Sequence, residues 1–169
     1  VLGRRETTRI DGDFVSEVTE VVNASGVQNL TFDHSNPGLF RIWQINAADI
    51  QSLTSEGDAI DARGPGQLIQ FDIPVLNAGD DLATIDASDA PLDTHIGANM
   101  ASSSFSGGGF NAVDTANDAV ITLSDQNDAF AWKAMEDNNA TIDGGDNDDP
   151  DPGARKGDLL YLSGEQNDG

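Results

Sequence analysis

The sequence alternates along its whole length between short apolar runs rich in Val, Ile, Leu and Phe and clusters of Gly, Pro, Asn, Asp and Ser. Such runs, bounded by turn-forming residues, are typical of β-strands joined by turns and loops. About eight are recognisable, at residues 14–22, 30–32, 39–45, 67–73, 82–85, 119–123, 140–142 and 158–162. No amphipathic helical stripe is longer than three turns, so we predict an all-β protein with less than about a fifth helix.

Two segments leave the type of secondary structure open. Asn46 is placed to cap a short helical turn through residues 47–53. Residues 129–135 fit a helix and a strand equally, because a strand there would set Phe130, Trp132 and Ala134 on one side.

The expected strands have to enclose a core, because a flat sheet of that size would leave one apolar face in water. A chain of 169 residues is one ordinary domain. The polar stretches at 86–118 and 143–157 are too long for hairpin turns but suit long connections between sheets. No repeat of 20 to 50 residues is visible, which disfavours solenoids and propellers. We therefore predict a single jelly-roll-like β-sandwich over residues 14–169, preceded by an N-terminal arm at 1–13.

The charge of the chain is strongly one-sided. Thirty acidic residues, 24 of them Asp, stand against eight basic ones, for a formal charge of −22. So much like charge destabilises a small domain in dilute buffer, whereas molar salt shortens the Debye length to about 3 Å. We therefore expect a halophilic source and no direct contact with nucleic acid. The absence of cysteine excludes disulfides, thiol catalysis and Cys-ligated zinc.

The N-terminal arm is the one basic part of the sequence. Residues 1–9 have a local charge of +2, which leaves −24 on the rest of the chain. We predict that Arg4, Arg5 and Arg9 contact either the carboxylates of a neighbouring subunit or an anionic membrane surface. The alternative is a tail whose charges are incidental.

The histidines do not form a recognisable catalytic motif. His34 lies between Asp33 and Ser35, and neighbouring residues on a strand point to opposite faces, so this triplet cannot form a catalytic triad. His95 likewise belongs to no metal-binding spacing. We predict a protein that is not an enzyme and has no cofactor.

The acidic, glycine-containing segment at 143–153 is the best candidate for a cation site. Its carboxylates are the hard oxygen ligands that Ca²⁺ prefers. The candidate ligands are Asp143, Asp146, Asp148, Asp149 and Asp151. The spacing departs from an EF-hand loop, because Pro150 is the fifth residue counted from Asp146 and no suitable Glu follows. The alternative is a hydrated surface loop adapted to salt.

The length, the expected strands, the basic arm and the acidic body resemble the smaller major capsid proteins of tailless icosahedral haloarchaeal viruses with an internal membrane, which are single jelly rolls. The resemblance covers the architecture and assigns no residue roles. It implies a virion protein that assembles with itself and other capsid subunits into an icosahedral shell, with the arm in contact with a neighbouring subunit or with the internal membrane surface.

Two other functions remain open. The opening segment 3–15 is similar to the start of some tail-tube proteins, so a tail-tube or decoration protein of a tailed haloarchaeal virus is one alternative. An extracellular binding or adhesion module on a haloarchaeal cell is the other. A signal peptide encoded upstream would favour the module, and an initiator Met directly before Val1 would favour the virion protein.

Overall fold

The computed structural model describes residues 7–11, 17–34, 39–57, 70–91, 93–97, 111–126, 128–134, 139–145 and 158–164. These residues contain thirteen strands and no helix, which confirms the all-β prediction. The strands are β1 (Thr7–Asp11), β2 (Glu17–Asn23), β3 (Asn29–Asp33), β4 (Leu39–Ala47), β5 (Ser52–Glu56), β6 (Gln70–Ile73), β7 (Val75–Ala78), β8 (Thr84–Asp86), β9 (Asp93–Ile96), β10 (Val120–Thr122), β11 (Ala129–Ala134), β12 (Thr141–Asp143) and β13 (Leu159–Gly164).

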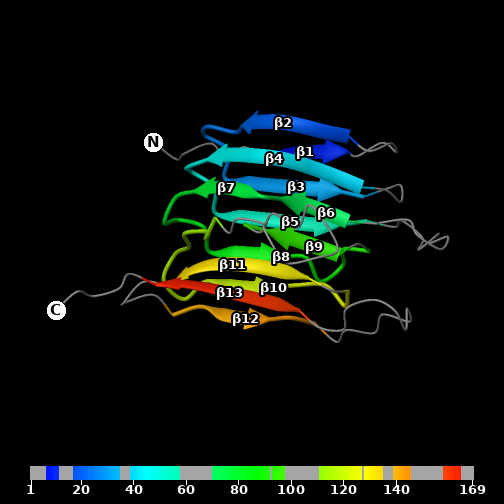
Figure 1. Cartoon of the computed structure of the whole chain (residues 1–169). Coiled ribbons are helices and arrows are strands. Elements are labelled where there is room, and N and C mark those ends of the chain that lie inside the picture. Colours follow the sequence, from blue (N-terminus) through cyan, green and yellow to red (C-terminus); the bar gives the residue numbers. More distant parts are fainter. Residues whose placement is uncertain are drawn as a thin grey trace.

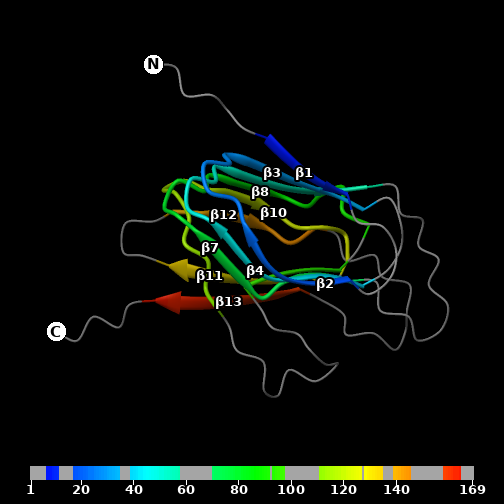
Figure 2. The ribbon, with the colours of Figure 1, turned by 90° about the horizontal axis from the view of Figure 1, so that it is seen from above.

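The strands form two parallel sheets that face each other. One sheet has the order β1-β3-β5-β8-β10-β12, and the other runs β13-β11-β9-β6-β4-β2, with β7 also paired to β4. The chain passes from one sheet to the other and back, so each coil adds a strand to both sheets. Figure 1 shows these coils stacked from β1 and β2 down to β12 and β13, and Figure 2 looks along the stack between the sheets. The described residues therefore form a parallel β-solenoid of six coils.

The jelly-roll prediction was wrong. A jelly roll is built from antiparallel strands, whereas every pairing between the described strands is parallel. The sequence argument against a solenoid was also wrong, because the repeat varies in length. Partners in register are 22 residues apart at Thr7 and Asn29 but 32 apart at Ser52 and Thr84. Insertions between coils hide the period.

The core lies between the sheets and is built by the same inward positions in successive coils. Alternate residues are buried in β3 and β5, as a strand with one covered face requires. In the first sheet the aligned inward residues are Leu30, Leu53, Ile85 and Ile121. In the second sheet they include Ile73, Ile96 and Phe130. Each such side chain contributes about 2 kcal/mol by leaving water.

An asparagine ladder joins the ends of three strands of the second sheet and is formed by Asn23 on β2, Asn46 on β4 and Asn77 on β7. Asn46 Nδ2 donates to Asn23 Oδ1 at 2.8 Å, and Asn77 Nδ2 donates to Asn46 Oδ1 at 2.7 Å. Gln44 Nε2 also donates to Asn46 Oδ1, at 2.8 Å. A side-chain amide can donate one hydrogen bond and accept another. Asparagine can therefore occupy the same position in three successive coils and bond to the coil on each side.

Part of the expected arm belongs to the solenoid. Thr7–Asp11 form β1, which pairs with β3 in parallel register at the edge of the first sheet. The expected arm at residues 1–13 therefore includes the strand β1. At the ambiguous segment near the C-terminus, residues 129–134 form the strand β11.

Candidate functional site

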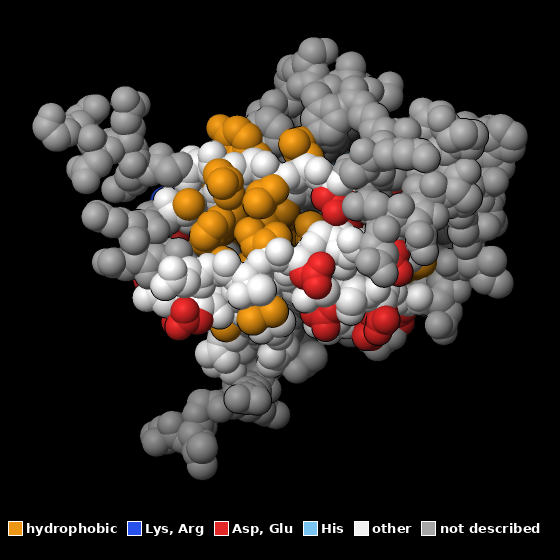
Figure 3. Space-filling model, turned by 90° about the horizontal axis from the view of Figure 1, so that it is seen from below, with side chains coloured by type: hydrophobic (Ala, Val, Ile, Leu, Met, Phe, Trp, Pro, Cys, Tyr) orange, Lys and Arg blue, Asp and Glu red, His pale blue; other side chains and the backbone are white. Residues whose placement is uncertain are grey.

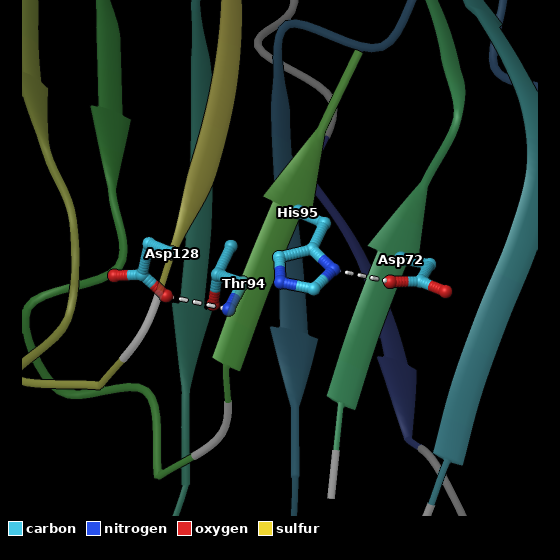
Figure 4. Close-up of polar contacts among 4 residues, drawn as sticks. All are labelled: Asp72, Thr94, His95 and Asp128. Atoms are coloured by element: carbon cyan, nitrogen blue, oxygen red, sulfur yellow. Dashed lines mark hydrogen bonds and ion pairs between the residues drawn. The ribbon is translucent and has the colours of Figure 1, made fainter. Parts of the chain in front are cut away.

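A buried polar cluster crosses neighbouring coils of the second sheet. It contains Asp72 on β6, Thr94 and His95 on β9, and Asp128 directly before β11 (Figure 4). The parallel register sets Asp72 beside His95, and His95 Nδ1 lies 3.0 Å from Asp72 Oδ1. Asp72 is fully buried and His95 is only 7% exposed. This pairing comes from strand register, because the two residues are 23 positions apart in the chain.

Asp128 lies in the segment between β10 and β11 and is hydrogen-bonded to the coils on either side. Its carboxylate accepts hydrogen bonds from Thr94 N at 2.6 Å, Ser124 N at 2.7 Å and Ser124 Oγ at 2.9 Å. Its own amide donates to Asp158 Oδ1 at 3.0 Å. Burial raises the pKa of the Asp128 carboxyl to about 7, against the lowering effect of the hydrogen bonds from Thr94 and Ser124. Asp128 thus ties three successive coils together.

His34 makes a second buried contact between coils, at the end of the first sheet. Its Nε2 is hydrogen-bonded to Ser55 Oγ at 2.9 Å, and its ring centroid lies 4.9 Å from that of Phe71. Burial lowers the pKa of His34 to about 4, so the ring is neutral at pH 7. The partner Ser55 belongs to the next coil, which no reading of the local triplet around His34 could reveal.

The chemistry of this cluster is limited by its burial. An Asp–His pair orients a general base when a nucleophile and a substrate reach the ring. Here Asp72, Thr94, His95 and Asp128 are all buried. Their observed contacts join adjacent coils, which positions the strands of the second sheet. The absence of catalysis stays a prediction.

An acidic column runs along the end of the first sheet. Asp11, Asp33 and Glu56 occupy aligned register positions on β1, β3 and β5. Neighbouring strands in a sheet are about 4.8 Å apart, and like charges directly opposite each other are destabilising. The sequence showed an excess of carboxylates but not this alignment, since the three residues are far apart in the chain.

The predicted cation ligands are mostly outside the described residues. Asp143 ends β12, is exposed, and accepts a hydrogen bond from Gly145 N at 3.2 Å within a local turn. Asp146, Asp148, Asp149 and Asp151 lie outside the described part of the chain. Among the residues that are described, no group of three or more His, Asp or Glu side chains is placed to hold a metal ion.

The predicted assembly arginines are only partly placed. Arg9 lies in β1 and is aligned with Thr31 of β3. Arg4 and Arg5 fall outside the described residues.

An open cavity of about 390 Å³ lies on the second sheet near the turn side. Its lining combines apolar residues with amide, hydroxyl and ammonium groups: Val75, Leu76, Asn77, Asn111, Ala112, Lys133 and Ser163. Lys133 Nζ forms an ion pair with Asp114 Oδ2 at 2.9 Å, which fixes the position of the ammonium group. No pattern in the sequence indicates this cavity, because its lining residues come from different coils.

No protein-family model matches the chain, no curated protein matches it, and no solved structure matches it. Within the described residues, no helix is long and apolar enough to pass through a bilayer. The candidate sites therefore rest on their own geometry.

Proposed function

We propose that this protein is a structural protein that assembles with itself in a high-salt environment, in a virion or on a cell surface. The observation that supports the proposal best is that buried polar side chains form contacts between coils. His34, His95 and Asp128 are buried in contacts between coils, where they stabilise the stack and are withdrawn from solvent. Each coil of a solenoid contacts its neighbours and extends the same surface, which suits a scaffold.

The high-salt part of the proposal is supported by the acidic column together with the net charge of −22. Aligned carboxylates repel one another in dilute buffer, and molar salt screens that repulsion. A protein with this surface is expected to be most stable where salt is concentrated.

The place in a virion remains open within this proposal. A capsid subunit in an icosahedral shell was inferred from a resemblance to single jelly rolls, and the parallel coils remove that architectural premise. Tail-tube, decoration and other virion roles do not need a jelly roll. In each of them the partners are further copies or other virion subunits, with no direct contact to nucleic acid.

The proposal is tested on the purified full chain in buffers from 0.1 to about 4 M NaCl, by thermal melting, sedimentation velocity and electron microscopy. We expect the melting temperature to rise steeply with salt, and association that grows with protein concentration. A strictly monomeric protein across the whole concentration and salt range would contradict a self-assembling role.

A second candidate function, an extracellular binding module, is favoured by the cavity of about 390 Å³. A lining that combines apolar side chains with amide, hydroxyl and ammonium groups suits a hydroxyl-rich ligand such as an oligosaccharide. Titration calorimetry with a panel of neutral and acidic oligosaccharides tests this function. Binding that is lost in Asn111→Ala and retained in Asn23→Ala, an amide outside the cavity, would support the module.

A further inference from the structure

We propose that copies of this chain stack head to tail, with the N-terminal coil (β1 and β2) of one copy placed on the C-terminal end (β12 and β13) of the next. This inference rests on the proposed structural role and specifies its geometry. It follows from the apolar surface at the C-terminal end, and from the open strand edges and the strand register at the two ends of the solenoid.

The C-terminal end exposes side chains that continue columns covered in the preceding coil, where Phe130 is buried and Trp132 is half-buried. Leu160 is aligned with Phe130, and Leu162 is aligned with Trp132. Phe130 is 1% exposed, whereas Leu160 is 45% and Leu162 56% exposed. Figure 3 views the molecule from this end and shows hydrophobic side chains gathered on it. A further coil placed there would cover them as each coil covers the one before it.

The strand edges at this end are open to further pairing. Among the described strands, β12 pairs with β10 and β13 pairs with β11, and no other strand lies beyond them in either sheet. An edge strand presents unpaired N–H and C=O groups that another strand can use. At the opposite end, β1 and β2 are the outermost described strands of the same two sheets.

The parallel register of the two ends fits a second copy in head-to-tail orientation. If the parallel register of the first sheet continues across the junction, β1 of the incoming copy follows β12, with Thr7 beside Thr141 and Arg9 beside Asp143. A basic position then meets an acidic one in the first sheet, whereas in the second sheet the continued register sets Glu17 beside Asp158. The apolar surface and the open strand edges therefore carry the contact, and the pair of Arg9 and Asp143 fixes its register. A heterologous contact of this kind does not close and therefore produces filaments.

Cysteine crosslinking tests the geometry directly, because the chain contains no cysteine. The strand spacing of about 4.8 Å is within the Cα separations that a disulfide bridges. We expect the double variant Thr7→Cys/Thr141→Cys, oxidised in molar salt, to give a ladder of covalent multimers that dithiothreitol dissolves. Thr7→Cys alone and Thr141→Cys alone should give no species larger than a dimer. Efficient dimers from Thr141→Cys alone, without a ladder from the double variant, would show tail-to-tail packing and overturn the inference.

A matched pair of surface substitutions tests the apolar contact. Leu162→Asp places a charge on the C-terminal end, whereas Val120→Asp places one at a residue of similar exposure, 47%, on the flank of the first sheet. We expect Leu162→Asp to weaken association at least tenfold and Val120→Asp to leave it unchanged, with the β signature in circular dichroism intact in both. Association that persists in Leu162→Asp without a crosslinked ladder would overturn the head-to-tail geometry and leave the structural role standing. A wild-type monomer at every concentration would contradict both.

Charge reversal gives an independent check. Asp143→Arg alone or Arg9→Asp alone should weaken association in moderate salt, and the combined variant should restore it, since the two positions are proposed to meet across the junction. Failure of the combined variant to recover association would count against the proposed register.

Discussion

The asparagine ladder and the acidic column are both made by stacking similar side chains in successive coils, but their consequences are opposite. Asn23, Asn46 and Asn77 form two hydrogen bonds of 2.7–2.8 Å near the ends of their strands. Asp11, Asp33 and Glu56 occupy aligned register positions at the end of the first sheet. A solenoid places each residue beside its counterpart in the next coil, so a side chain that both donates and accepts stabilises the stack. An ionised carboxylate can accept hydrogen bonds but cannot donate one, and it repels a neighbouring carboxylate.

The largest expected effect on stability comes from a titratable group in the interior, His34. Its pKa is lowered from 6.5 to about 4, so between these values the unfolded chain binds the proton and the folded chain does not. Stability is therefore full above pH 6.5 and falls as the pH drops toward 4, by about 3 kcal/mol for this group. His34→Gln, which keeps a hydrogen-bonding side chain without this titration, should remove that loss.

The measurement is the difference in unfolding free energy between wild type and His34→Gln, from denaturant titrations at pH 4.5, 5.5 and 7.5 in constant molar salt. The difference is needed because Asp128, with a pKa raised to about 7, contributes the opposite slope: its share of stability falls as pH rises from about 4 to 7. A wild-type-minus-variant difference that does not change with pH would show that His34 is not buried and neutral as described.

The next largest effect tests the asparagine ladder at its centre. Asn46→Ala removes the hydrogen bonds to Asn23, Asn77 and Gln44. Because each bond contributes about 1 kcal/mol or less, we expect the free energy of unfolding to fall by about 2 kcal/mol. Asn23→Ala removes one ladder bond and serves as the control, with an expected loss of about 1 kcal/mol or less. Thermal and chemical unfolding measure both. Equal losses at the two positions would mean that the bonds along the ladder do not act separately.

The smallest effect tests the acidic column. Asp33→Asn removes the middle charge of the column and should stabilise the protein in 0.1 M salt by about 0.5 kcal/mol. The gain should vanish in molar NaCl, where the repulsion is screened. Asp81→Asn, an exposed carboxylate in a turn outside the column, is the control and should give a smaller gain. A gain from Asp33→Asn that persisted in molar salt would point to a cause other than charge repulsion.

The sequence by itself determined the class of secondary structure and many of the strand positions. Alternation of apolar and polar residues in segment 119–123 sets which side chains face inward, and β10 forms there. The apolar run 39–45 forms β4, where Ile42 and Ile45 are both buried. The one-sided charge likewise follows from composition alone. None of these features specifies which strand lies beside which.

Only the tertiary structure decided the direction of pairing and the register. A strand with a period of two is compatible with parallel and antiparallel partners, and coil lengths that vary from 21 to 36 residues conceal the repeat. Asn23, Asn46 and Asn77, near the ends of β2, β4 and β7, carry the repeat in the sequence, but at unequal intervals. Register then brings His34 to Ser55 and Asp72 to His95. These contacts depend on the winding of the whole chain, because each joins residues from two different coils.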